Sequence, residues 1–382
     1  MPRCANQRKK QEEFIPLSEE SIISTLHVTC EALRSNPVFH LSLHSKELFH
    51  SNFLAWFCEE YPRNASRVFG EWVPVRETTS HLVERELRDL DLVIELPGLA
   101  PFVIENKVFS PPDEAQLQRY SSAEKIASLV DPTLILLSLG SPNWIGSEFL
   151  AAGNRVWTHV SYEVLAKKLS EEVVNITGFD GQLLEKYVKF LESLVQLVHT
   201  VGIPRLEDLV DPSNELMEVL RGIRMHDAVG KLRARSACAS IEKASNDLEV
   251  GGPMRFHANF TNGSPLLEGF VECGNGDRLG WQYQQNQWRL AVKTDVHHGR
   301  SVDERRRRHE YVAKRYGGWF NFSCLSSILG RPVTDVPPTE AKGEYCGYNP
   351  DFVYRYRKVS GLTVGELTRL SRTCLESAKE WL

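Results

Sequence analysis

Two short runs of β-forming residues, joined by a Pro-Gly pair, constrain the fold of this chain more than any other stretch. The first run, Leu92-Val93-Ile94, follows Asp91, and the second, Phe102-Val103-Ile104, leads into Glu105-Asn106-Lys107. Pro97-Gly98 interrupts the apolar sequence between them. This pattern predicts a β-hairpin that carries two acids and a lysine near its open end.

The position of the turn predicts which residues face each other. If the turn is centred on Gly98, Asp91 and Glu105 are equally far from it and pair directly, with Cβ atoms about 4.5–5.5 Å apart. Side chains alternate along a strand, so Lys107 shares the face of Glu105 and Asn106 points to the other face. A register shift of one residue would instead separate the two acids.

Two opposed carboxylates repel each other unless a cation lies between them. Mg²⁺, or Mn²⁺ as its substitute, suits a site of two carboxylates with carbonyl and water oxygens. Lys107 could position a water molecule or stabilise charge on a phosphate. The alternative is a surface hairpin whose outer face happens to be charged, and this pattern alone leaves that alternative open.

The ordered set Asp91, Glu105-Asn106-Lys107, Gln116 and Tyr120 resembles the PD-(D/E)XK nuclease superfamily, in the branch with a QxxxY element. The segment from Glu47 to Trp56 is similar to the first helix of that family. The resemblance covers about residues 40–175. One departure is Leu90, which stands where the family often has proline.

The resemblance implies a restriction-endonuclease-like α/β core, in which helices flank a mixed sheet. It also implies a metal site formed by Asp91, Glu105, the Asn106 carbonyl and Glu47. Gln116 and Tyr120, which share a helix face, would contact DNA or order the lysine. From the residues alone, Glu47 is equally an acid favoured in the first turn of a helix. Asp89 competes with Asp91, and the hairpin register favours Asp91.

Periodicity and breakers predict the remaining elements. We expect helices at 18–34, 45–61, 161–174, 181–199, 214–247, 303–316 and 363–382, and one opened by Pro111-Pro112-Asp113. Strands are expected at 72–76, 89–96, 102–108, 134–139, 155–160, 267–273, 279–284 and 287–294. Residues 78–89 are expected to form a loop or a long hairpin. Pro204 and Pro212 mark a boundary, which predicts a nuclease-like domain over 1–201 and an α+β domain over 202–382.

Composition narrows the function classes. Eight scattered cysteines without a C-x-x-C pair argue against zinc ribbons and indicate reduced thiols in a cytoplasm. The sequence contains no run that approaches 18 consecutive apolar residues, so no membrane span is predicted. The net charge of −5 divides into −8 over residues 1–200 (19 Lys/Arg, 27 Asp/Glu) and +3 over residues 201–382 (26 Lys/Arg, 23 Asp/Glu). This asymmetry suggests that the second half supplies phosphate contacts.

The expected nucleic-acid contacts are six basic residues of one helix, which has tyrosines among them: Arg305, Arg306, Arg307, Arg308, Lys314 and Arg315. A solvated helix face with internal salt bridges is the alternative.

The sequence thus predicts a Mg²⁺-dependent phosphodiesterase, with DNA a better expected substrate than RNA and defence against foreign DNA as its setting by analogy. The C-terminal region would select the substrate, bind a partner protein or form a homo-oligomer. The competing interpretation is a catalytically inactive module of the same fold that binds nucleic acid or protein.

Overall fold

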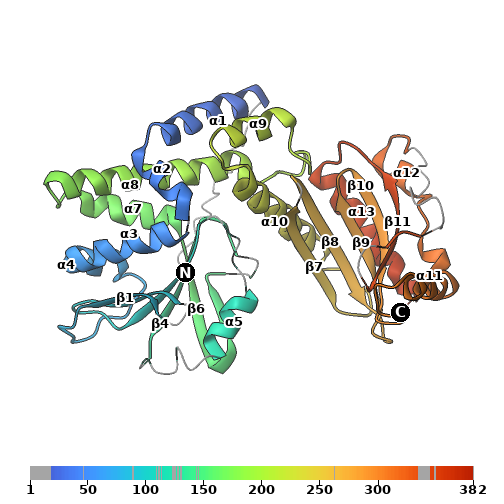
Figure 1. Cartoon of the computed structure of the whole chain (residues 1–382), viewed down its shortest axis with the longest axis horizontal. Helices are drawn as coiled ribbons and strands as arrows, with labels where there is room; N and C mark the ends of the chain where they lie inside the picture. Colours follow the sequence, from blue (N-terminus) through green and yellow to red (C-terminus); the bar gives the residue numbers. More distant parts are fainter. Residues whose placement is uncertain are drawn as a thin grey trace, which may run out of the picture.

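The computed structural model of the chain describes residues 19–45, 47–87, 90–108, 110, 112, 114–122, 126, 129, 131–142, 144, 146–261, 263–333, 345–347 and 350–381. It is a mixed α/β structure with two sheets, which lie toward opposite ends of the long axis in Figure 1. The first sheet is mixed and the second is antiparallel. The α/β class expected from the sequence is therefore confirmed.

Six strands form the first sheet in the order β1-β2-β3-β4-β6-β5. Their bounds are β1 (Leu82–Leu87), β2 (Leu90–Glu95), β3 (Phe102–Lys107), β4 (Thr133–Ser138), β5 (Glu148–Ala151) and β6 (Arg155–Ser161). β1, β2 and β3 are antiparallel neighbours, whereas β3, β4 and β6 run parallel. The carboxyl ends of the three parallel strands therefore meet at one edge of the sheet, where β3 ends in Lys107.

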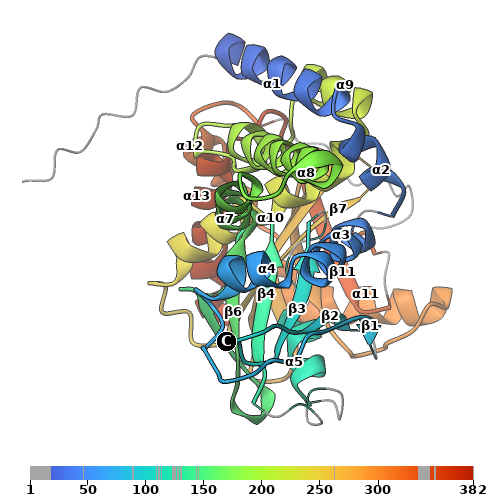
Figure 2. The same cartoon turned by 90° about the vertical axis from the view of Figure 1, so that its left-hand side faces the viewer.

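Helices cover both faces of this sheet (Figure 2). A large core lies on one face beneath α1 (Glu19–Arg34), α2 (Pro37–Ser45), α3 (Glu47–Glu60), α4 (Pro62–Phe69), α7 (Tyr162–Val173) and α8 (Gly178–Leu197). A smaller core on the other face contains Leu117 of α5 (Glu114–Ser122) and the strand residues Val93, Val103 and Trp157. The apolar run of β4 contributes to both cores, as expected for a strand buried on its two sides.

The second sheet has the order β11-β10-β9-β8-β7. Its strands are β7 (Met254–Thr261), β8 (Ser264–Glu272), β9 (Arg278–Gln284), β10 (Gln287–Lys293) and β11 (Phe352–Lys358). The helices are α9 (Asn214–Gly222), α10 (His226–Ser245), α11 (Val302–Tyr316), α12 (Leu325–Leu329) and α13 (Val364–Ser377). The described residues also form four short helical turns: η1 (Ala152–Asn154), η2 (Val198–Gly202), η3 (Gly317–Trp319) and η4 (Ala378–Trp381).

Helix α10 contributes to the cores of both sheets. Its first turns place Ala228 and Val229 in the core of the six-stranded sheet, whereas Cys238 and Ile241 belong to the core of the second sheet. In Figure 1 this helix lies between the two sheets. The division of the chain at residue 202 stays a prediction, because α9 and α10 follow that point and still pack on the first core.

Several expected elements differ in the structure. The strand expected at 72–76 is wrong, because only a single bridge joins Val75 to Leu99. Helix α2 was not expected, and it begins at Pro37, shortly after α1 ends at Arg34. The Asn36 side chain accepts a hydrogen bond from the Val38 N–H at 2.9 Å, and proline is favoured in a first helical turn. The helix expected over 214–247 is two helices, α9 and α10, separated around Arg224, which has a φ of 59°.

Other predictions hold or remain untested. Of the loop and the long hairpin considered for residues 78–89, the structure has the hairpin, which β1 and β2 form. Strands β5, β7 and β11 were not expected. Asp89, Pro111 and Asp113 lie outside the described residues, so the structure does not test the competition with Asp91 or the expected Pro-Pro-Asp start of α5.

Candidate active site

The hairpin of β2 and β3 has the register that the Pro-Gly turn predicts. Leu92 pairs with Ile104, Val93 with Val103 and Ile94 with Phe102. Gly98 adopts a φ of 81°, a conformation that favours glycine and makes the turn. Beyond the last of these pairs, the main-chain N–H of Asn106 donates a hydrogen bond to Asp91 Oδ2 at 2.7 Å. The Asp91 carboxylate therefore lies directly beside the strand segment Glu105–Lys107.

Glu105 and Lys107 form a buried ion pair on the α5 side of the sheet. Lys107 Nζ lies 2.7 Å from Glu105 Oε1, and Glu105 is only 1% exposed. Glu105 Oε2 is buried and has no hydrogen-bond partner among the residues that the structure describes. One carboxylate oxygen of this site is thus available to a ligand.

The two acids have raised pKa values. Burial, followed by the nearby Asp91 carboxylate, raises the pKa of Glu105 to about 7, although Lys107 opposes the shift. Burial also raises the pKa of Asp91, against the lowering effects of the Asn106 N–H and Lys107. Burial alone would lower the pKa of Lys107. The charge of Glu105 and its hydrogen bond to the lysine outweigh burial, so the pKa of Lys107 is raised above its ordinary value. The site therefore holds more negative charge than its one lysine neutralises.

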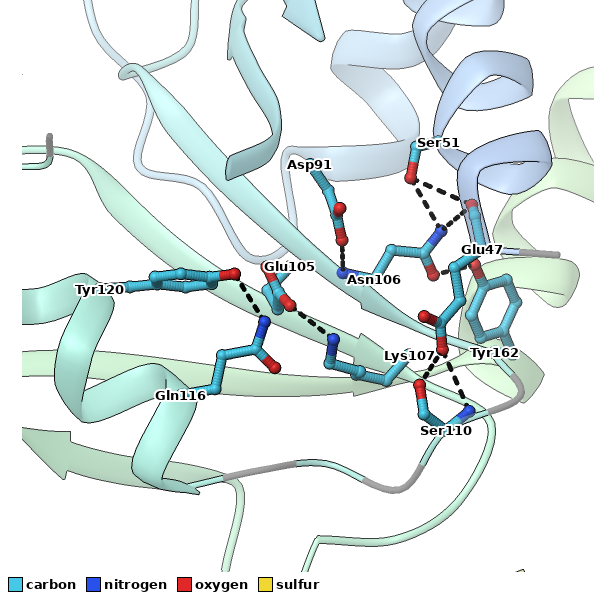
Figure 3. A network of polar contacts seen from close by, with 10 residues as sticks. All are labelled: Glu47, Ser51, Asp91, Glu105, Asn106, Lys107, Ser110, Gln116, Tyr120 and Tyr162. Carbon is cyan, nitrogen blue, oxygen red and sulfur yellow. Dashed lines mark hydrogen bonds and ion pairs between the residues drawn. The ribbon is translucent and has the colours of Figure 1, made fainter. Parts of the chain in front are cut away.

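Asn106 points to the opposite face, as the alternation predicts, and is fully buried. Its Nδ2 donates to Ser51 Oγ at 3.2 Å and to the Glu47 carbonyl at 3.3 Å. Its Oδ1 accepts a hydrogen bond of 2.5 Å from the Tyr162 hydroxyl. These contacts attach β3 to α3 and to α7 (Figure 3).

Glu47 lies at the start of α3 beside the acids, but it has its own partners. Its Oε1 accepts hydrogen bonds from the Ser110 N–H at 3.0 Å and from the Ser110 hydroxyl. Its charge contributes to the raised pKa values of Asp91 and Glu105. In the described part of the chain, no three His, Cys, Asp or Glu side chains form a group that could hold a metal ion. Glu47 is thus near the acid pair, and its role as a metal ligand stays a prediction.

Gln116 and Tyr120 project from the same face of α5, as their spacing predicts. Gln116 Nε2 donates to the Tyr120 hydroxyl at 2.6 Å. Burial raises the pKa of Tyr120, and the charges of Glu105, Lys107 and Asp91 also act on it. Figure 3 shows the Tyr120 hydroxyl directed toward the Glu105 carboxylate. Side chains from β2, β3 and α5 are therefore brought together.

The donor set fits a divalent, oxygen-binding cation. Asp91 and Glu105 supply carboxylates from neighbouring strands, and the unpartnered Glu105 Oε2 is an orphaned acceptor within the site. A cation would remove the repulsion that, together with burial, raises the pKa of Glu105. Hard cations such as Mg²⁺ and Mn²⁺ prefer such oxygen ligands.

Of the six basic residues of α11 that were expected to contact nucleic acid, five are exposed and one is buried. Arg305, Arg307 and Lys314 are among the exposed ones. Arg308 corrects the expectation, because it is 1% exposed and its Nη1 donates to the carbonyls of His297 and Gly299 at 2.9 and 3.1 Å. It ties a loop to the helix and is not on the surface.

The other two basic residues of α11 are exposed but have local partners. Arg306 forms ion pairs with Asp303 at 3.3 Å and with Glu310 at 4.0 Å. Arg315 Nε donates to the Tyr316 hydroxyl at 2.9 Å.

Ser51, Ser110 and Tyr162 are site residues that sequence reasoning missed. Ser51 follows Glu47 by one helical turn, a spacing that could have indicated it. Tyr162 comes from the start of α7 and Ser110 from after β3, and no local pattern links them to the acids.

Comparisons of the chain with protein-family models, with curated proteins and with solved structures found no significant match. Among the described residues, no helix combines the length and apolar character required to cross a membrane.

Proposed function

We propose that this chain is a metal-dependent nuclease of the PD-(D/E)XK type, with a restriction-endonuclease-like core, that hydrolyses phosphodiester bonds. One observation carries the proposal: Asp91 and Glu105 come together from adjacent antiparallel strands, beside Lys107, and one buried Glu105 oxygen lacks a partner. Acids and a lysine in this arrangement are suited to binding a hard cation and to stabilising charge on a phosphate.

Asp91 and Glu105, with the main-chain carbonyl of Asn106, would hold Mg²⁺, or Mn²⁺ as a substitute. When bound, the ion would lower the pKa of a coordinated water and offset charge on the scissile phosphate. Lys107 is held by Glu105 at 2.7 Å, so its ammonium group is directed at the same place and donates to the attacking water or to a phosphate oxygen.

Gln116 and Tyr120 would contact the substrate from α5. Both are partly exposed, and their mutual hydrogen bond of 2.6 Å holds the amide and the hydroxyl together above the acids. The Gln116 carbonyl oxygen, the amide N–H groups and the tyrosine ring suit a strand of nucleic acid. Glu47 would act through Ser110, with which it forms two hydrogen bonds.

DNA is the proposed substrate, and defence against foreign DNA in the cytoplasm is the proposed setting. The exposed Arg305, Arg307 and Lys314 of α11 support phosphate contacts by the C-terminal half. That half would select the substrate, or bind a partner protein or a second copy of the chain.

Cleavage assays test the proposal. The purified chain is incubated with supercoiled, linear and single-stranded DNA and with RNA, in Mg²⁺, in Mn²⁺ and in a chelator. We expect metal-dependent cleavage that Asp91→Ala and Lys107→Ala abolish while the proteins remain folded.

Matched controls separate the site from general damage. Glu95→Ala changes an acid at the other end of β2, and Lys168→Ala removes a 2.7 Å ion pair with Glu71 outside the site. Both controls should keep their activity. If the wild-type chain cuts no form of DNA or RNA with either metal, the nuclease proposal fails and the chain is a binding module.

A further inference from the structure

Helix α10 packs on the carboxyl edge of the six-stranded sheet, at which β3 ends in the candidate active site. A Cβ atom on Gly140, which follows the end of β4 by two residues, would lie 2.5 Å from Leu232 Cδ2 of α10. A cavity of about 90 Å³ beside this contact is lined by Gly140, Ser161, Leu232 and Ser236 among others. In Figure 1, α10 lies between the two sheets. The C-terminal half therefore reaches the edge of the first sheet through this helix.

The contact between α10 and Gly140 is close to the acids and the lysine of the candidate site. Strand β4 is the parallel neighbour of β3, and Lys107 pairs with Ser138, the last residue of β4. Neighbouring strands lie about 4.8 Å apart, and two residues span at most about 7 Å. Gly140 is therefore no more than about 12 Å from the main chain of Lys107.

One face of α10 carries two cations beside this contact. Lys231 and Arg235 are separated by one helical turn, and both are half-buried. At about 100° per residue, they lie about 100° and 60° from Leu232 around the helix, on the same side of it. Ser236, which lines the cavity, lies about 40° to the other side. The two cationic side chains therefore flank the contact with β4 and are not part of it.

The same face of α10 approaches α5. Glu242 follows Arg235 by about two helical turns and thus shares its face. Burial, followed by the Glu114 charge, raises the pKa of Glu242, whereas Arg235 lowers it. Glu114 is the first residue of α5, two residues before Gln116 of the candidate site. Along the helix, Arg235 therefore lies between the contact with β4 and the approach to α5, which covers the side of the sheet that carries the candidate site.

A nucleic-acid strand in the candidate site would need cations near it. Asp91, Glu105 and Glu47 place negative charge there, and Lys107 is held by Glu105 at 2.7 Å. Each nucleotide adds a further negative charge, so the phosphates next to the scissile bond are repelled unless lysine or arginine offsets them. The exposed cations of α11 lie at the far end of the molecule in Figure 1, away from the six-stranded sheet. The cations of α10 lie beside that sheet.

We propose that Lys231 and Arg235 bind backbone phosphates of the substrate strand next to the scissile bond, so that α10 positions the substrate. The inference rests on the proposed function, because it takes a nucleic acid as the substrate. At about 3.4 Å per nucleotide, the distance of about 12 Å from Lys107 to the end of β4 corresponds to about three or four nucleotides. Glu114 and Glu242 repel phosphates, which confines the contact to the part of α10 from Lys231 to Arg235. Phosphate contacts carry no sequence information, so the effect is the same for every sequence.

DNA binding by the full chain tests the proposal without requiring cleavage. The Asp91→Ala chain, in a chelator, is titrated with a DNA duplex and with a single strand at several salt concentrations. Lys231→Gln with Arg235→Gln removes both charges and keeps polar side chains. We expect the slope of log affinity against log salt to fall by about 1.8 on the duplex, or about 1.4 on the single strand. On the duplex, the affinity advantage of the chain that keeps both cations should therefore shrink about tenfold from about 50 to about 200 mM salt.

Two control variants separate the effect of charge from damage to the fold. Lys231→Arg with Arg235→Lys keeps both charges and should keep the slope. Lys189→Gln with Arg221→Gln removes two exposed cations of α8 and α9, each paired with an acid of its own helix at 2.5 Å, and should also keep the slope.

The outcomes distinguish this inference from the proposed function. A slope that Lys231→Gln with Arg235→Gln leaves unchanged, an equal loss in the charge-preserving variant, or no DNA binding at all overturns the inference. If the slope falls as expected but the wild-type chain cleaves no nucleic acid, the phosphate contacts stand and the nuclease proposal fails. If the wild-type chain cleaves DNA while the slope is unchanged, only the contact by α10 fails.

Discussion

The main-chain N–H of Asn106 donates a 2.7 Å hydrogen bond to the Asp91 carboxylate, across the junction between β3 and β2. This bond joins the two strands just beyond the last regular pair, Leu92 with Ile104. It fixes the partly buried Asp91 beside the buried Glu105. The account of function depends on this relationship, because two neighbouring acids withdrawn from water require a compensating positive charge.

Substitution of Lys107 should separate metal binding from cleavage. Lys107→Met keeps the aliphatic stem and removes the ammonium group, so cleavage should fall about 100-fold or more. Mn²⁺ affinity should be retained, because Glu105 Oε1 loses the lysine that competes with a metal ion. Parallel cleavage assays and calorimetry measure the two effects. Lys168→Met is the control, and loss of Mn²⁺ binding in Lys107→Met would contradict this division.

The pKa of Glu105 predicts how stability depends on pH. In the folded chain this pKa is raised to about 7, above its ordinary value of 4.5, so the folded state binds the proton more tightly than the unfolded state. Without metal, the stabilising contribution of the protonated acid is therefore present at pH 4 and is lost as the pH rises through 7.

Glu105→Gln should remove the loss of folding stability that ionisation of Glu105 causes as the pH rises. The metal-free variant should be more stable than the wild type at pH 8, by about 1–3 kcal/mol, and this advantage should disappear near pH 4. Denaturant unfolding at both pH values measures it. Mn²⁺ should stabilise the wild type and not the variant. An advantage of equal size at pH 4 and pH 8 would show that titration of Glu105 is not its cause.

Tyr162 should support the site from beneath the sheet. Tyr162→Phe leaves the buried Asn106 Oδ1 without its donor, so the free energy of unfolding should fall by about 1–3 kcal/mol. Cleavage should also decrease, because Asn106 positions Asp91 and the start of α3. Tyr61→Phe, which breaks a partly exposed bond to Asp180, is the control and should cost less. Equal unfolding free energies for wild type and Tyr162→Phe would refute this role.

The exposed arginines of α11 should affect nucleic-acid affinity, and the buried one should affect folding. Arg305→Ala with Arg307→Ala should weaken DNA binding and reduce the salt-dependence slope by about 2, or roughly one per phosphate contact. Arg308→Ala should instead destabilise the fold by about 2 kcal/mol or more, since it holds two carbonyl groups. DNA-binding titrations of the Arg305→Ala, Arg307→Ala double variant at several salt concentrations measure this slope. A salt-dependence slope equal to that of the wild type would show that α11 is not part of the DNA interface.

The elements nearest the acids could be predicted because their signals are local. Gly98 fixed the turn, and the alternation of side chains then put Glu105 and Lys107 on the α5 face and Asn106 on the other. The continuous apolar run of β4 and the i, i+4 spacing of Gln116 and Tyr120 are equally local.

The parts that could not be predicted depend on long-range contacts. Tyr162 reaches Asn106 from 56 residues away, and no sequence pattern specifies such a bond. Helix α2 was not expected, because proline disfavours a helix interior, yet proline is favoured in a first helical turn. The hydrogen bond from Asn36 to the Lys186 carbonyl of α8, which lies beside the start of α2, is a long-range contact. Arg308 was grouped with its neighbours because charge alone does not distinguish a buried guanidinium from an exposed one.

Titration of wild type and Asp91→Ala with Mn²⁺ tests the central claim most directly, because metal binding by the Asp91–Glu105 pair precedes every later step. The account predicts saturable Mn²⁺ binding by the wild type, and its loss in Asp91→Ala while Glu95→Ala still binds. Absence of binding in the wild type, or equal binding in Asp91→Ala, would contradict it.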